Sequence, residues 1–179
     1  MNQSTPPKYP LSTSQLNSLT LDNPFWQFSL KQWKNESLQK ALLSLQDQHN
    51  FKINRLLFAM WLGVENKLLE PHLETLEQET SDWQTQVVEP LRSIRKILAK
   101  HHLKDCVQEA ELQAEQIEQA LLFKLSEQIP ETVHLNTLYI LTHNLFASRL
   151  PESHLLLCIQ ACLPAYSQAH ILSCISELK

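Results

Sequence analysis

An unbroken apolar run near the middle of the chain limits the folds that this sequence can adopt. Every residue from Leu56 to Val64 is apolar or glycine, so a helix formed by this run has no face suited to water and must be covered on several sides. The run is less than half of the ~20 apolar residues that a membrane-spanning helix needs. We therefore expect a buried central helix over about residues 52–65, and we expect no membrane contact.

Glycine is almost absent, and this scarcity excludes several kinds of site. The 179 residues include one glycine, whereas average usage near ~7% would supply about a dozen. Phosphate-binding loops and tight hairpin turns depend on this residue. No alternation of strand period is long enough to indicate a sheet. We predict an all-α, single-domain helical bundle of about six to eight helices.

Capping residues and helical spacing indicate where the other helices lie. Asn23 and Pro24 pair an N-cap residue with proline at the first helical position, and we interpret the aromatic-rich segment after them as core packing. Asn50 and Asn66 are candidate left-handed helix terminators. The apolar spacing predicts further helices over residues 37–48, 71–98, 103–127, 132–149 and 151–178, the last with a break at Pro164.

Two neighbouring stretches of opposite charge indicate a helical hairpin. The apolar stripe that begins at Trp83 continues in phase across Pro90, which predicts one long helix with a kink at the proline. Basic residues end that helix and acidic residues begin the next. A turn near residues 101–104 would lay the two stretches together. The expected partners are Arg92, Arg95 and Lys96 on one side and Glu111, Glu115 and Glu118 on the other.

Composition separates a short N-terminal segment from the rest of the chain. Residues 1–21 are rich in Pro, Ser, Thr, Gln and Asn, which predicts a flexible arm ahead of a single helical domain over residues 22–179. The four cysteines show no disulfide spacing pattern, and no apolar leader segment is visible, so we expect a cytoplasmic protein. The net charge of −4 gives no attraction to nucleic acid.

Three sequence blocks of the chain form a distinctive pattern. They are Asn-Pro-Phe-Trp-x-Phe-Ser-Leu from Asn23, Leu-Gln-Asp followed by Asn-x-Leu-Leu-Phe-x-x-Trp-Leu between Leu45 and Leu62, and Trp83 followed by Val-Val-x-Pro-Leu-Arg-x-x-Arg. Together the blocks resemble a family of small bacterial proteins known only as a domain of unknown function. The resemblance extends from Asp22 to Phe123. It implies an all-α fold and no particular activity.

Polar residues beside the central helix are the first candidates for a binding site. Asp47 and Asn54 flank that helix, and Arg92 and Arg95 have a three-residue spacing that suits bidentate recognition of a carboxylate or phosphate. The four could line a polar pocket for a small anion. The competing interpretation is structural, with Asp47 and Asn54 capping backbone groups and the arginines held in salt bridges.

Cysteine and histidine residues near the C-terminus are candidate metal ligands. Cys158 and Cys162 are four residues apart, and so are His170 and Cys174. Two antiparallel helices could therefore present four ligands to zinc. Cysteines among leucines more often behave as small buried hydrophobic residues, so a structural role competes with the metal site.

The functional hypotheses rest mainly on what the sequence lacks. It has no nucleotide-binding loop, no paired acidic motifs and no local nucleophile signature, so we assign no catalytic residue and no cofactor. These absences favour a non-enzymatic protein-interaction or regulatory module with an unknown protein partner. The alternative is a small-ligand-binding or catalytic helical domain that uses Asp47, Asn54, Arg92 and Arg95. An exposed apolar groove would favour the first hypothesis and a pocket lined by those four residues the second.

Overall fold

The computed structural model describes residues 11–179, which form an all-α fold. The helices are α1 (Thr13–Asn17), α2 (Pro24–Trp33), α3 (Glu36–His49), α4 (Ile53–Val64), η1 (Glu70–His72), α5 (Leu73–Trp83), η2 (Gln84–Val88), α6 (Glu89–Ile97), α7 (Lys104–Ser126), α8 (Thr137–Ala147), α9 (Glu152–Cys162) and α10 (Gln168–Glu177). The predicted fold class is confirmed. No helix in the described range is long and apolar enough to span a bilayer.

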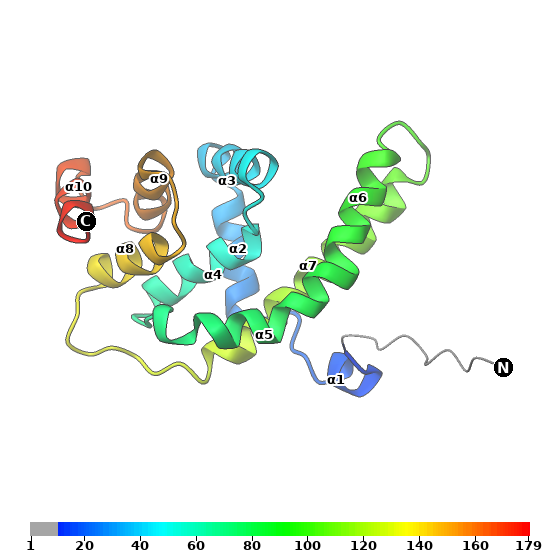
Figure 1. Cartoon of the computed structure of the whole chain (residues 1–179), viewed down its shortest axis with the longest axis horizontal. Helices are drawn as coiled ribbons and strands as arrows, with labels where there is room; N and C mark the ends of the chain where they lie inside the picture. The colour runs from blue at the N-terminus through cyan, green and yellow to red at the C-terminus, as the bar shows by residue number, and fades with distance from the viewer. Residues whose placement is uncertain (1–10) are drawn as a thin grey trace.

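The apolar run forms α4, which lies at the centre of the bundle. Phe58, Ala59 and Met60 have no exposed surface. α8 packs along α4, and α2, α7 and α9 also contact it, so the helix is covered from several directions (Figure 1). Trp61 is an exception, because it is half-buried and packs against Phe28 of α2 with ring centroids 5.5 Å apart.

The only glycine of the chain lies where α4 crosses α8. A Cβ atom on Gly63 would stand 2.6 Å from the Cα of Leu141, which is closer than real Cβ atoms approach. Asn144 of α8 is fully buried and forms hydrogen bonds with the segment that connects α4 to η1. Its amide donates to the carbonyl of Lys67 and accepts from the N–H of Leu69, each at 2.8 Å. The scarce glycine is therefore used for close helix packing.

Asparagine takes the place of glycine at helix ends. Asn50 and Asn66 have φ angles of 57° and 55°, in the left-handed region that usually ends helices. Both terminators were expected from the sequence. Asn136 caps α8 by accepting from the N–H of Tyr139 at 2.7 Å, which explains why α8 begins at Thr137 instead of the expected residue 132.

α5, η2 and α6 form one continuous helical rod through Pro90. The chain keeps right-handed helical angles at the junctions, with φ −65° and ψ −44° at Trp83 and φ −62° and ψ −42° at Glu89. A proline ring clashes with the carbonyl four residues earlier in a regular α-helix. The wider π-helical turn η2 ends at Val88, two residues before Pro90, and accommodates that ring. One long helix was the prediction for this segment.

α6 and α7 make the expected hairpin, which projects from the body of the molecule (Figure 1). A small second core lies at its base, where the indole of Trp83 donates to the carbonyl of Ala114 at 2.9 Å. Leu11 and Leu16 pack on this core. The short helix α1 lies within residues 1–21, the segment that was predicted to be a flexible arm. Residues 1–10 lie outside the described range, and the domain boundary after residue 21 stays a prediction.

Candidate functional site

A groove of about 690 Å³ opens between the N-terminal helices and α7. Its walls come from α2, α3, the first turns of α4, and α7, and Arg95 reaches it from α6. We call this feature the α2–α7 groove. Small-molecule sites occupy roughly 300–1,000 Å³, so the volume alone does not distinguish a ligand pocket from a surface that binds part of another protein.

One side of the groove is apolar because α2 repeats large side chains at helical spacing. Trp26, Leu30 and Trp33 are separated by four and three residues and line the groove together. Leu30 is 40% exposed, and Leu43 of α3 and Leu112 of α7 are 39% and 47% exposed. Both of these leucines also line the groove. The lining is therefore an apolar surface that remains open to solvent.

The floor of the groove is polar and belongs to a buried network that joins α4, η2 and α7. Asn54 donates from Nδ2 to Oε2 of Glu118 at 2.6 Å and accepts from Nε2 of Gln119 at 2.8 Å. With its amide nitrogen toward Glu118, Gln84 donates to both carboxylate oxygens at 2.8 and 2.9 Å. Burial raises the pKa of Glu118 to about 7, and the hydrogen bond from Asn54 opposes this shift.

The two arginines of α6 are held by acids of α7. Arg92 places Nε 3.1 Å from Oε1 of Glu111 and Nη2 2.7 Å from Oε1 of Glu115. Arg95 bonds to the other oxygen of Glu111, and this hydrogen bond raises the pKa of the Arg95 guanidinium. Burial raises the pKa of Glu115, while the charge of Arg92 lowers it. The pairs of Arg92 and Arg95 with Glu111 and Glu115 match the expected hairpin. Lys96 and Glu118, which were expected to take part, instead contact Asp47 and Asn54.

The four residues of the expected polar pocket are divided between different surroundings. Asn54 and Arg95 line the groove. Arg92 is engaged by the acids of α7, and Asp47 is exposed on α3 with its Oδ1 3.4 Å from Nζ of Lys96. Two of the four residues therefore come together at one cavity. A binding role for them stays a prediction.

Sequence reasoning missed the apolar half of the groove. The aromatic segment was interpreted as core packing, which holds for Phe25 because it has no exposed surface. Trp26 and Trp33 are only half-buried and line the groove, although Trp33 also packs against the core. A signal was present in the sequence, because large side chains occur on adjacent faces of α2 and one buried stripe cannot cover them all.

Two further acids give the groove an unbalanced negative charge. Asp105 and Glu109 of α7 line it, and neither forms an ion pair within residues 11–179. Glu111 and Glu115 also line it but are paired with the arginines of α6. The net charge presented by the lining is therefore negative.

The four expected zinc ligands have different surroundings, and a metal-binding role for them stays a prediction. Cys158 and Cys174 are buried, whereas His170 is exposed and packs on Tyr166 with ring centroids 5.4 Å apart. Burial raises the pKa of the Cys158 and Cys162 thiols, and a neutral thiol is a poor metal ligand. Within the described residues, no three His, Cys, Asp or Glu side chains form a group that could hold a metal ion.

Comparison with known proteins identifies a family for this chain. The family model described as Protein of unknown function (DUF2390) matches residues 24–122, more than half of the chain. The chain belongs to this family, which confirms the expected resemblance. No curated protein and no solved structure matches it. The matched residues run from the start of α2 almost to the end of α7, so they include every residue that lines the α2–α7 groove.

Proposed function

We propose that this member of the family is a non-enzymatic interaction module whose α2–α7 groove holds an amphipathic, basic helix of a partner protein. The observation that carries the proposal is the open apolar lining, in which Leu30, Leu43 and Leu112 keep 40%, 39% and 47% of their surface exposed. Exposed apolar surface gathered in one depression favours a binding role.

A helix suits this groove because helices form its walls. α2, α3 and α7 offer no strand edge to which an extended peptide could add. The apolar face of a helix can instead place side chains from successive turns against Trp26 and Trp33. Indole rings give large, rigid contact areas at a low cost in conformational entropy, and such residues dominate many binding interfaces.

The acids of the groove favour a basic helix over an acidic one. Lys or Arg residues beside the apolar face of the partner would lie near Asp105 and Glu109, which have no cation partner in the described residues. Charges at the edge of an interface mainly change the association rate and its dependence on salt. An acidic helix would be repelled by the same residues.

The proposal places this role in the cytoplasm. Support comes from the four cysteines, all of which are free thiols. Thiols persist in reducing compartments, whereas oxidising compartments favour disulfides.

A second candidate function is the binding of a small polar ligand at the floor of the groove. The Oγ of Ser29 and the Oε1 of Gln119 are buried and have no hydrogen-bond partner in the described part of the chain, and both residues line the groove. Buried polar atoms are usually paired, so a ligand with donor groups would satisfy them. Arg95 is less suited to binding such a ligand because Glu111 already occupies it.

A pair of designed peptides tests the proposed docking. One is a Leu/Lys amphipathic helix, and the other carries Glu at each Lys position. We expect the basic peptide to change the fluorescence of Trp26 and Trp33 and to bind more weakly as salt rises. Leu112→Lys should weaken binding by about tenfold or more, because it removes apolar contact and adds repulsion.

Leu172→Lys is the matched control, because Leu172 is 39% exposed on α10, outside the groove. Its affinity for the basic peptide should equal that of the wild type. Equal binding of the two peptides, or equal loss in the two lysine variants, would refute the proposed docking. If neither peptide binds and the double variant Ser29→Ala, Gln119→Ala loses a small-molecule ligand found by screening, the second candidate function replaces the first.

A further inference from the structure

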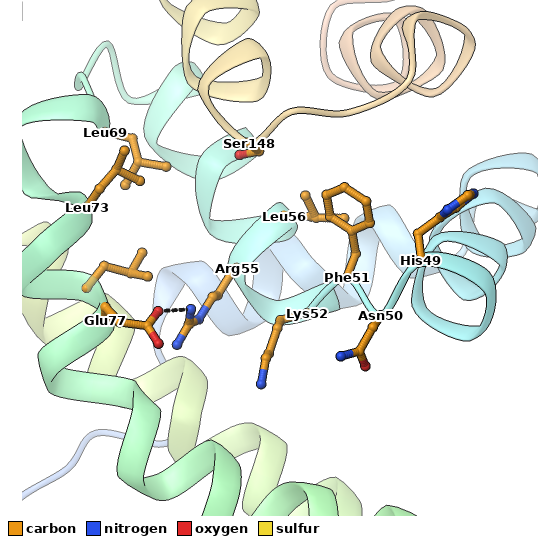
Figure 2. Close-up of a pocket in the computed structure, with 11 residues that line it drawn as sticks. His49, Asn50, Phe51, Lys52, Arg55, Leu56, Leu69, Leu73, Glu77 and Ser148 are labelled. Carbon is orange, nitrogen blue, oxygen red and sulfur yellow. Dashed lines mark hydrogen bonds and ion pairs between the residues drawn. The ribbon is translucent and has the colours of Figure 1, made fainter.

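A second cavity, of about 420 Å³, lies beside the start of α4 and shares no lining residue with the α2–α7 groove. It is built from the α3–α4 connection, α4, α5, and Ser148 at the end of α8. Figure 2 shows Arg55 and Glu77 along one side, Leu69 and Leu73 beside them, and Phe51 facing from the α3–α4 connection. The cavity therefore combines one charged side with apolar walls.

Arg55 is the principal cation of this cavity. Its Nη1 bonds to Glu77, and its Nη2 lies 3.0 Å from Oγ1 of Thr80. The Nε of Arg55 is buried and has no acceptor among residues 11–179. A guanidinium binds a carboxylate best when two of its N–H groups donate in parallel, whereas Glu77 contacts Arg55 at Nη1 and Thr80 contacts it at Nη2.

Glu77 shows that a carboxylate fits against this arginine. The hydrogen bond from Arg55 lowers the pKa of Glu77 below its ordinary value, so the group is ionised at neutral pH. The side chain of Glu77 is 58% exposed, compared with 20% for Arg55. Ion pairs with an exposed partner contribute little to stability. Glu77 therefore binds Arg55 weakly, and another carboxylate can replace it.

Apolar side chains make up the rest of the wall. Leu56, Leu69 and Leu76 are buried, whereas Leu73 is 38% exposed where the cavity meets solvent. The N-terminus of α4 adds a favourable field for an anion, because no side chain within residues 11–179 caps it. The ammonium of Lys52, at the N-cap position, is paired with Glu89. An anion with an apolar tail matches both parts of this lining.

We infer that this cavity binds a small organic acid with an apolar tail, whose carboxylate takes the Nη1 side of Arg55 in place of Glu77. The tail lies against Leu69, Leu73 and Leu76. Release of Arg55 frees Glu77 to turn into solvent. This site is independent of the α2–α7 groove and of the helix proposed to bind there.

Octanoate is the probe for this site, and its neutral amide, octanamide, is the matched compound. In nitrogen-15 correlation spectra of the full chain, octanoate should shift the amide signals of residues 50–56 and 73–77. The indole signals of Trp26 and Trp33 should stay in place, because both residues line the other groove. Octanamide should bind at least about tenfold more weakly, because it cannot form the charged pair with Arg55.

Three variants separate the proposed geometry from general attraction of an anion. Glu77→Gln removes the internal competitor and should tighten octanoate binding about threefold or more. Arg55→Lys keeps the positive charge but lacks the planar guanidinium with its several N–H donors, so it should weaken octanoate binding. Glu74→Gln removes a charge from the same helix outside the cavity and should leave affinity unchanged. The inference is overturned by absent octanoate binding, by shifts confined to the tryptophans, by equal binding of octanamide, or by equal effects of the two glutamine variants.

Discussion

At the scale of single residues, Glu118 is a carboxyl group buried inside the bundle. It is 1% exposed and accepts from Asn54, while the amide of Gln84 lies against both of its oxygens. A neutral carboxyl could donate to the Gln84 oxygen if that amide turned over, whereas the ionised form accepts from its nitrogen. Either protonation state can therefore be hydrogen-bonded inside the bundle.

The pKa of Glu118 predicts a definite dependence of stability on pH. Its folded value is about 7 and its ordinary value is 4.5, so the folded state binds the proton more tightly. The stabilisation is fully present below pH 4.5 and is lost as pH rises through 7, with a magnitude of at most about 3 kcal/mol. Urea unfolding between pH 4.5 and 8 should therefore show a falling free energy of unfolding that Glu118→Gln flattens. Parallel curves for both proteins would contradict this assignment.

Gly63 gives a second prediction at this scale. Glycine-to-alanine changes inside helices usually stabilise by roughly 0.5–1 kcal/mol. At Gly63 the new Cβ would stand 2.6 Å from the backbone of Leu141, and relief of such overpacking costs about 1–3 kcal/mol. Gly63→Ala should therefore lower the melting temperature. Because the nearest atom is Leu141 Cα, adding Leu141→Ala should not restore it, and an unchanged melting temperature in the single variant would refute the close crossing.

Residue-level features were predictable where their cause is local in the sequence. Asn23 caps α2 by accepting from Trp26 N–H at 2.9 Å, and the Asn-Pro pair was sufficient to predict it. The role of Gly63 could not be predicted, because it depends on a helix that follows much later in the chain. Glu118 was expected to pair with α6, but it lies further along α7, where its neighbours are Asn54 and Gln84.

At the scale of helices, opposite charge blocks specify how α6 lies on α7. The pair between Arg92 and Glu115 has an Nη2–Oε1 distance of 2.7 Å, and the two side chains are 15% and 29% exposed. Such partly buried pairs are coupled more strongly than those in open solvent. The hairpin register was therefore accessible from sequence, whereas the π-helical form of η2 was not, because its spacing differs little from that of an α-helix.

A charge exchange tests this register. Arg92→Glu and Glu115→Arg should each destabilise the protein, and the double exchange should recover part of the loss, with a coupling of about 0.5–3 kcal/mol that decreases as salt rises. The pair between Lys40 and Glu36 is the control, because its side chains are 78% and 85% exposed. Its exchange should give a coupling of at most about 0.5 kcal/mol. Strictly additive effects at Arg92 and Glu115 would exclude the hairpin contact.

At the scale of the whole molecule, α4 is covered both by helices that precede it in the chain and by helices that follow it. The matched family region contains α2 to α7 and the entire α2–α7 groove, but α8 and α9 also pack on α4. The sequence predicted a covered central helix without identifying which helices cover it. It also could not show the groove, because residues from α2, α3, α4 and α7 meet there only after folding.

The packing of α8 on α4 predicts that the chain folds as one unit from α2 to α10. A fragment of residues 22–126 keeps the family region but lacks α8. It therefore exposes the face of α4 around Gly63, which contacts Leu141 in the whole chain. It also loses the hydrogen bonds that Asn144 makes to Lys67 and Leu69. We expect this fragment to keep helical circular dichroism while it loses the near-ultraviolet signal of its tryptophans and unfolds without cooperativity. The control, residues 22–179, should unfold in one transition. A cooperative transition in residues 22–126 would show that the family region is a domain by itself, and that α8 to α10 are an addition to it.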